Sequence, residues 1–310
     1  SRIDVITNPE GIIYENDMVP NAFVEHYELF LGQAGNVDHF NSNNLFKVRL
    51  NEQDALDMVR DVSDQEVKTA IFSMGNDKAP GPDGFTAAFF KEAWNVIAID
   101  VTHAVREFFR NGTLLKELNH TIIALIPKVK SPSRVNDYRP ISCCNVLFKC
   151  ISKIIANRIK HGLKTIISPN QSAFVLGRNI TDNILLTQEL MHNYHLDRGS
   201  PRCAFKVDIQ KAYDTVDWDF LRMILHGFGF HDKMVSWIIE CVTTSSYSIC
   251  VNGSLYGYFK GKRVSDDSSG RIWRFAEVGF GYAVVAALAP SFVVVASVLD
   301  FWLGMVATIV

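Results

Sequence analysis

Residues 206 to 217 read Lys-Val-Asp-Ile-Gln-Lys-Ala-Tyr-Asp-Thr-Val-Asp and place a carboxylate, Asp208, directly after a short apolar run. Residues 203–207 have the composition of a buried strand, and residues 218–228 have the apolar spacing of a helix. Asp208 and Tyr213 are therefore expected at a strand-to-helix junction, where α/β proteins gather ligand-binding groups. The stretch suggests a metal-binding corner, although a lone Asp after a strand is also a common helix cap or surface residue.

Four further motifs accompany this stretch: Lys78-Ala-Pro-Gly-Pro-Asp-Gly84, Ile126-Pro-Lys128, Asp137-Tyr-Arg-Pro-Ile-Ser142, and Gln171-Ser-Ala-Phe174 followed by Gly177-Arg178. In order and spacing the five together resemble the reverse transcriptase of LINE-type (non-LTR) retrotransposons, particularly those of plants. The resemblance covers roughly residues 5–263. Five motifs in register are far harder to meet by chance than any one of them.

The resemblance implies an RNA-directed DNA polymerase with an α+β, right-hand fold of fingers and palm. Its partners would be an RNA template, a DNA primer and deoxynucleoside triphosphates. In such enzymes palm carboxylates hold two Mg²⁺ ions, which activate the primer 3′ hydroxyl and neutralise the leaving pyrophosphate. Asp208 matches the strand-end Asp of that family and is the expected catalytic and metal-binding residue.

The resemblance also implies nucleotide contacts. Lys128 and Arg139 match residues that contact the incoming nucleotide, and the Ser/Pro/Asn loop between them suits a lid over a triphosphate. Tyr213 matches the aromatic residue that excludes a 2′ hydroxyl. The alternative for Lys128 and Arg139 is an ordinary exposed hairpin loop, and the alternative for Tyr213 is a tyrosine of the core. Three further residues match contacts to template and primer, namely Gln171, Phe174 and Arg178. They could equally form a loop ahead of a helix over 181–194.

The family pattern stops after Gly261-Lys-Arg263. Relatives continue with a Gln-Gly-x-Pro-Leu-Ser-Pro segment and a hairpin reading aromatic-x-Asp-Asp, and this chain has neither. Asp266-Asp267 lacks the preceding aromatic and sits in a Ser/Gly-rich stretch typical of a loop. Two ions need carboxylates from more than one strand. The chain is therefore expected to be homologous to an enzyme but unable to polymerise.

Charge divides the chain unevenly. The net charge is −10 over residues 1–109, +10 over residues 110–263 and −2 over residues 264–310. Residues 116–164 hold 10 basic and 2 acidic residues, with Lys149 and Lys153 on a helical pattern that also carries Arg158 and Lys160. Such a helix can bury one stripe and turn the other toward template or primer phosphates. A solvated basic face is the alternative.

Local signals give a coarse secondary structure. Ser63-Asp-Gln-Glu66 is a capping box that opens a helix to Met74. A second helix is expected over residues 85–110, a strand over 121–126, and a hairpin of 247–251 and 255–259 turned by Asn252-Gly253. The division expected from all these signals is an N-terminal extension or linker (1–60), fingers (61–200), a partial palm (201–263) and a non-family hydrophobic tail (264–310).

The six cysteines show no Cys-x-x-Cys pair and no His at finger spacing, so zinc is not expected. The chain begins at Ser1 without a signal peptide. We therefore expect the cysteines to be reduced thiols and the protein to lie inside the cell, in cytoplasm or nucleus. We also expect the chain to be truncated from a longer product.

The tail holds 22 uncharged residues, 278–299, preceded by basic residues. That length meets the requirement of about 20 residues for a membrane span. A C-terminal anchor competes with sequence translated after a frameshift or mis-spliced junction, and the abrupt loss of family pattern favours the second. The functional alternatives to an inactive reverse transcriptase fragment are a non-catalytic nucleic-acid-binding remnant and a membrane-anchored protein.

Overall fold

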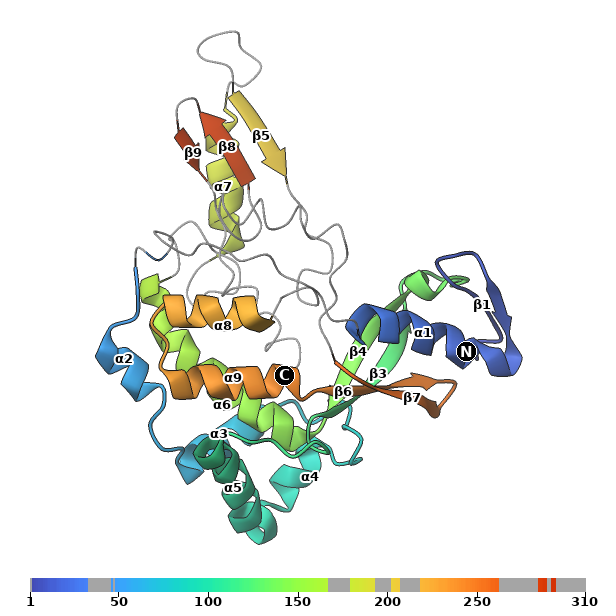
Figure 1. Ribbon diagram of the computed structural model, residues 1–310, viewed down its shortest axis with the longest axis horizontal. Helices are drawn as coiled ribbons and strands as arrows, with labels where there is room; N and C mark the ends of the chain where they lie inside the picture. Colours follow the sequence, from blue (N-terminus) through green and yellow to red (C-terminus); the bar gives the residue numbers. More distant parts are fainter. Residues whose placement is uncertain are drawn as a thin grey trace.

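The computed structural model is a mixed helix and sheet structure (Figure 1). The residues it describes are 2–32, 46, 48–166, 179–192, 202–206, 218–261, 284–288 and 291–293. The predicted mixture of helices and strands is confirmed.

Within the described residues the strands form separate sheets. The strands are β1 (Val5–Thr7), β2 (Ile13–Glu15), β3 (His120–Pro127), β4 (Tyr138–Cys144), β5 (Arg202–Lys206), β6 (Ser246–Val251), β7 (Ser254–Lys260), β8 (Val284–Leu288) and β9 (Ser291–Val293). The helices are η1 (Asn16–Met18), α1 (Val19–Gly32), α2 (Glu52–Asp57), α3 (Asp64–Phe72), α4 (Ala87–Glu92), α5 (Trp94–Asn111), η2 (Val135–Asp137), α6 (Val146–Ile166), α7 (Ile180–Leu190), α8 (Trp218–Gly227) and α9 (Asp232–Thr243).

The largest sheet has the strand order β4-β3-β6-β7. β3 pairs antiparallel with β4 and parallel with β6, so Ile123 lies between Ser142 and Ile249. The β6–β7 hairpin turns at Asn252 (φ 52°) and Gly253 (φ 84°), the left-handed pair that a two-residue turn requires. The predicted hairpin is confirmed. The hairpin strands β6 and β7 lie in the same sheet as β3 and β4.

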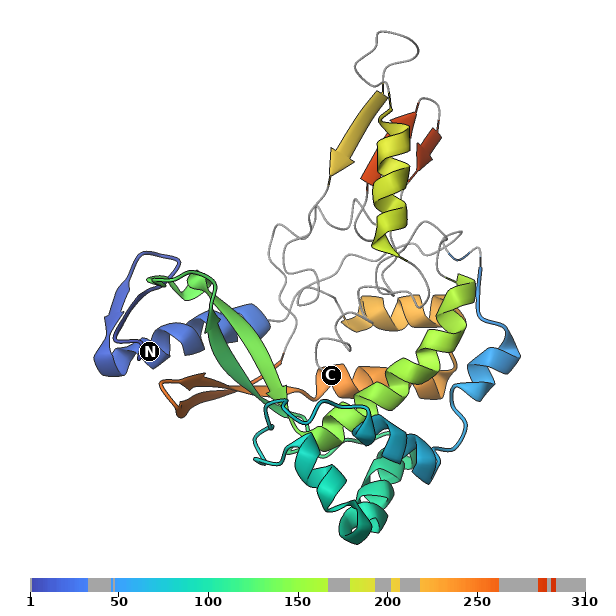
Figure 2. The same ribbon diagram turned by 180° about the vertical axis from the view of Figure 1, so that it is seen from behind.

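The N-terminal segment covers one face of this sheet. Figures 1 and 2 show α1 lying across the strands, and Phe23 from α1 is fully buried together with Ile6 from β1. They join one apolar cluster with Ile123 and Ile249 of the sheet. Burying apolar side chains of this size stabilises the fold by about 1.5–3 kcal/mol each. Residues 2–32 therefore contribute to the core of this sheet, and the division of the chain into an N-terminal extension or linker, fingers, partial palm and tail stays a prediction.

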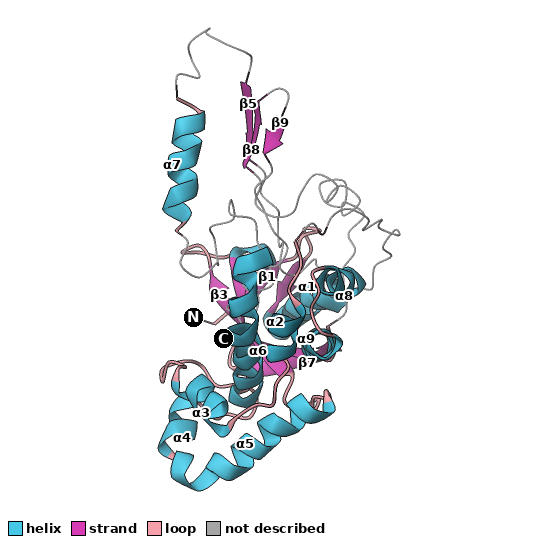
Figure 3. Cartoon of the chain, turned by 90° about the vertical axis from the view of Figure 1, so that its left-hand side faces the viewer, coloured by secondary structure: helices cyan, strands magenta, loops and turns pink. Residues whose placement is uncertain are grey.

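A second apolar core lies among the helices around α6 (Figure 3). The predicted apolar stripe of α6 is confirmed, because its members pack inward against α3, α5 and α9. The members are Val146, Leu147, Ile151, Ile154, Ile155 and Ile159.

Local signals mark helix ends well. Ser63 and Glu66 form the predicted reciprocal capping box at α3, which ends at Phe72, two residues before the expected end. The helix expected over residues 85–110 is instead two helices that share Ala93 as their boundary (ψ 1°). Both helices pack against α3.

The Pro-Gly-Pro-Asp-Gly loop is docked onto the start of α6. Asn145 Oδ1 accepts a hydrogen bond from the Asp83 backbone N–H at 3.2 Å, and Asn145 Nδ2 donates to the Glu117 carbonyl at 2.9 Å. A Cβ on Gly81 would overlap Asn145 Oδ1, Asn145 N and the Cys144 carbonyl carbon. Only a residue without a side chain fits there.

We expect Gly81→Ala to lower the free energy of unfolding by about 1–3 kcal/mol, the usual cost of overpacking. Urea denaturation measures the change. Gly75→Ala is the matched control, because a Cβ there meets the ends of the Asp77 and Lys78 side chains, which can move away. Equal stabilities of the two variants would contradict the docked geometry.

Part of the apolar tail is sheet. β8 pairs antiparallel with β5, so that Val284 faces Lys206, and β9 extends the sheet beside β8. These strands project with α7 from the helical body (Figures 1 and 3). Residues 284–288 and 291–293 therefore do not form a spanning helix, and they join the strand that leads to Asp208.

A search of the described residues finds no helix long and apolar enough to cross a membrane. The remaining positions of the run 278–299, and its basic flank from Lys262 to Arg274, lie outside the described residues.

Candidate functional site

The end of the β3–β4 ribbon brings together two predicted nucleotide contacts. Arg139 lies directly opposite Ile126 in the ladder, and the Lys128 backbone N–H donates to the Asp137 carbonyl at 2.7 Å. Both cationic side chains are exposed. Lys128 lies two residues after Ile126, so Lys128 and Arg139 are diagonal neighbours in the ribbon. Diagonal neighbours in an antiparallel pair lie about 7–8 Å apart, which places the two long cationic side chains within reach of one polyanion.

The loop between them is internally bonded. Asp137 Oδ2 accepts hydrogen bonds from the backbone N–H groups of Ser133 (3.0 Å) and Arg134 (2.9 Å). These two bonds hold the pKa of the Asp137 carboxyl below its usual value, and the charges of Arg134 and Lys128 act in the same direction. Lys128 Nζ donates to the Asn136 carbonyl at 2.7 Å. An ammonium has three N–H donors, so two remain for a ligand.

The loop is also anchored in the core. Val135 is 1% exposed and Tyr138 is 5% exposed. The Tyr138 ring meets Phe23 of α1 edge to face at 5.4 Å between centroids. From β1, the Thr7 N–H donates to the Ser133 carbonyl at 2.9 Å. The loop between Lys128 and Arg139 is thus bonded to and packed against the N-terminal segment, and its role as a lid stays a prediction.

Two basic residues of α6 point inward, which the sequence does not reveal. Arg158 is 4% exposed and donates two hydrogen bonds to the Glu66 carboxylate, both at 3.0 Å. It also donates to the carbonyls of Met58, Arg60 and Asp61. Lys149 is 7% exposed and donates to the Ala79 carbonyl at 3.1 Å. The contact of Lys149 with template or primer phosphates stays a prediction.

Lys153 and Lys160 are the α6 cations nearer to solvent. Lys153 is half-buried, and this burial, helped by the charge of Lys160, lowers the pKa of its ammonium. The basic face of α6 is therefore narrower than the sequence pattern predicts.

The remaining predicted site residues lie outside the described residues. They are Asp208, Tyr213, Gln171, Phe174 and Arg178. The predicted strand ahead of Asp208 is present as β5, which ends at Lys206. Among the described residues no group of His, Cys, Asp or Glu side chains is arranged to hold a metal ion.

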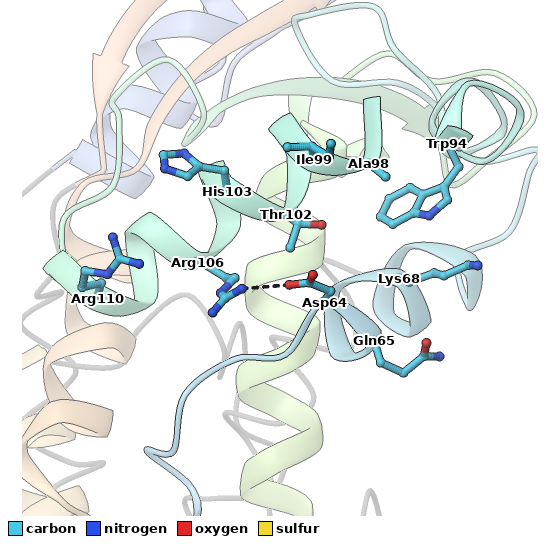
Figure 4. Close-up of a pocket in the computed structure, with 10 residues that line it drawn as sticks. All are labelled: Asp64, Gln65, Lys68, Trp94, Ala98, Ile99, Thr102, His103, Arg106 and Arg110. Atoms are coloured by element: carbon cyan, nitrogen blue, oxygen red, sulfur yellow. Dashed lines mark hydrogen bonds and ion pairs between the residues drawn. The ribbon is translucent and has the colours of Figure 1, made fainter. Parts of the chain in front are cut away.

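A shallow groove of about 420 Å³ lies between α3 and α5 (Figure 4). Trp94 lies at one end, and an ion pair between Arg106 of α5 and Asp64 of α3 (2.9 Å) joins the two sides of the groove. Neither helix contributes to the β3–β4 ribbon, so this groove is separate from the candidate site.

Sequence reasoning missed Asp137 and Thr7 as members of this site. The Asp137 contact had a signal, because an acid three residues after the start of a helical turn can accept a hydrogen bond from the backbone N–H there. At η2 the Asp137 carboxylate accepts the Arg134 N–H in this way, and the Asp137 N–H donates to the Arg134 backbone carbonyl. The Thr7 contact had none, since it joins residues far apart in the sequence.

Comparison with known proteins identifies the class. A family model described as reverse transcriptase (RNA-dependent DNA polymerase) matches residues 126–281, half of the chain. The match begins at the end of β3 and includes the ribbon loop and the β6–β7 hairpin. The chain belongs to the reverse transcriptase family.

The curated relatives are proteins of non-LTR retrotransposons. The transposon TX1 uncharacterized 149 kDa protein of Xenopus laevis is 28% identical over 68% of this chain and 16% of its own length. The Pol polyprotein of element R2DM from Drosophila melanogaster is 23% identical over 57% of this chain and 16% of its own. An R2 Pol polyprotein from Popillia japonica is 25% identical over 62% and 26%. The chain thus spans a sixth to a quarter of these relatives.

Proposed function

We propose that this chain is the fingers and part of the palm of a LINE-type reverse transcriptase, of plant type by its motifs, acting inside the cell. In this proposal Lys128 and Arg139 bind the triphosphate of an incoming deoxynucleotide on a template–primer duplex. The observation that carries it is the ribbon end, where two exposed cations stand together on a bonded loop. Charge-assisted hydrogen bonds to phosphate are about twice as strong as neutral ones.

Two Mg²⁺ ions would supply activation of the primer hydroxyl in the complete enzyme. Asp208, after strand β5, is the residue of this chain that matches a ligand. A second carboxylate pair with its preceding aromatic does not occur in the sequence. The donor set is therefore too small for both ions, and we propose that the chain binds nucleotide and template without transferring a nucleotidyl group.

A non-catalytic role in nucleic-acid binding is the second candidate. It is favoured by the exposed cations along the same ribbon end, which are Lys128, Lys130, Arg134 and Arg139. The carboxylate of Asp137 in their midst is occupied by backbone N–H groups. Such a surface would bind phosphates without reading bases, so the binding would be weak and steeply salt-dependent.

Nucleotide binding tests the first candidate. We expect Lys128→Ala and Arg139→Ala each to weaken dATP binding about tenfold or more, because a hydrogen bond to a charged group contributes about 1.5–3 kcal/mol. Calorimetric titration of the full chain with dATP and Mg²⁺, in the presence of an RNA template annealed to a DNA primer, measures the affinity.

Lys116→Ala is the matched control, since it removes one exposed positive charge before β3, at the other end of the ribbon. If all three variants bind dATP as the native chain does, the ribbon end is not a triphosphate site. Equal weakening by all three would indicate a diffuse charge effect and support only the second candidate.

A further inference from the structure

We propose that Asp137 and Thr7 are positioning residues that hold the loop of residues 128–137 in the conformation that presents Lys128 and Arg139 to the nucleotide. This inference rests on the proposed function of these two cations. It assigns a role to the N-terminal segment, whose strand β1 supplies Thr7.

The loop needs such support because its charged side chains are exposed. Fixing the backbone of one residue costs about 1–2 kcal/mol, so a loop that became ordered only on binding would lose affinity accordingly. Here the ordering is already present in the folded chain. The Ser133 and Arg134 N–H groups, which the ladder of β3 and β4 does not satisfy, both donate to the Asp137 carboxylate.

Asp137 is otherwise badly placed for a site that receives a polyanion. It is the acidic residue of a segment whose neighbours Lys128 and Arg134 are cations, and a free carboxylate there would repel phosphate. The structure shows what the carboxylate does instead. It satisfies backbone donors on one side, while its own backbone carbonyl receives the Lys128 N–H on the other.

Thr7 holds the same loop from outside. Its N–H donates to the Ser133 carbonyl, and Thr7 and Arg134 form an isolated parallel bridge. The N-terminal segment is in turn fixed at a second point, where the Ile3 N–H and carbonyl bond the Asn252 side chain at 2.8 and 2.9 Å. The segment therefore ties the tip of the β3–β4 ribbon to the tip of the β6–β7 hairpin.

Three variants separate these contacts from general stability. Asp137→Ala removes both acceptor bonds, and Asp137→Asn keeps an acceptor oxygen while removing the charge. Thr7→Pro removes the N–H that reaches Ser133. That N–H points away from β2, so the β1–β2 pairing keeps its bonds. Thr7→Val retains the N–H and is the control for Thr7→Pro. Glu10→Ala removes an exposed acid from the N-terminal segment and is the control for the lost charge of Asp137→Ala.

The affinity of each full-length variant for dATP and for deoxyadenosine is measured with Mg²⁺ and template–primer, together with its melting temperature. Amide hydrogen exchange at Ser133 and Arg134 reports on the loop itself. We expect Asp137→Ala and Thr7→Pro to weaken dATP binding about tenfold, the effect of having to order about one residue on binding. Deoxyadenosine affinity should stay unchanged, and the loss of dATP affinity should not scale with the change in melting temperature. The two amides should exchange faster in Asp137→Ala, and Asp137→Asn should recover part of the loss.

Native dATP affinity in Asp137→Ala and Thr7→Pro, while Lys128→Ala and Arg139→Ala still lose it, would overturn the positioning role and leave the nucleotide site standing. Native affinity in all four would overturn the proposed function itself. If the Asp137 and Thr7 variants lose dATP binding only in step with a lowered melting temperature, the two residues are structural and the inference is wrong.

Discussion

Arg158→Ala is expected to lower the free energy of unfolding by about 3–5 kcal/mol, the range for removing one partner of a buried ion pair. The Arg158 side chain is 2% exposed in its pair with Glu66. It also satisfies the carbonyls of Met58, Arg60 and Asp61, and its guanidinium lies 5.7 Å from the Phe109 ring centroid. Alanine leaves these three carbonyls without their guanidinium donors. Urea denaturation followed by circular dichroism measures the loss.

Arg106→Ala is the control, because Arg106 also pairs with an aspartate of α3 at 2.9 Å but with side chains 44% and 73% exposed. An exposed pair contributes about 0–1 kcal/mol. Similar losses in the two variants would show that burial of Arg158 does not matter.

The pH dependence gives a second check on the same pair. Burial by itself raises the pKa of Glu66, but hydrogen bonds from Arg158 and the Ser63 N–H outweigh it and leave the pKa below the usual value. A depressed folded-state pKa means that the stabilisation is present above the unfolded pKa of about 4.3 and is lost as pH falls through the folded value. The difference between native chain and Arg158→Ala should therefore shrink below about pH 4.

The second large effect concerns catalysis. We expect the purified chain to extend no DNA primer on an RNA template, with Mg²⁺ or with Mn²⁺, because one strand-end aspartate cannot position two ions. Denaturing gels of a labelled primer, with all four deoxynucleotides present, measure the reaction. An active reverse transcriptase of the same family, assayed in parallel, shows that substrates and conditions are adequate.

If primer extension is observed, Asp208→Ala and the double variant Asp266→Ala/Asp267→Ala show which residues it needs. Extension above background that Asp208→Ala abolishes would contradict the prediction and show that the metal site is complete. If the double variant abolished it too, Asp266 and Asp267 would be the second pair of ligands. Extension that survives both would point to a contaminating polymerase.

Local sequence signals predicted the secondary structure well where their physics is local. The Ser63 capping box and the Asn252-Gly253 turn each depend on residues within three positions, and both form as expected. The apolar stripe of α6 also packs as its spacing predicts. The break at Ala93 was not predicted, because the apolar spacing of residues 85–110 continues across it.

The basic residues of α6 show where such reasoning fails. Arg158 and Lys149 lie among lysines on one helix, and a charged side chain at helical spacing is ordinarily assigned to solvent. Their partners are the carbonyls of residues 58 to 61 and of Ala79, contacts that span 70 to 100 positions of sequence. No sequence pattern within α6 predicts these contacts.

The candidate site also has a part that the sequence predicts and a part that only the tertiary structure shows. Motif order and spacing were sufficient to assign the chain to its family and to single out Lys128 and Arg139, because a family's chemical groups recur at fixed places along the chain. Their common position at one ribbon end follows from the β3–β4 register, and the loop between them is held by Asp137 nearby and by Thr7 about 120 residues earlier. Backbone groups that every residue carries make the Thr7 contact, so side-chain identity cannot encode it, and it arises only when the sheet and α1 bring the two segments together.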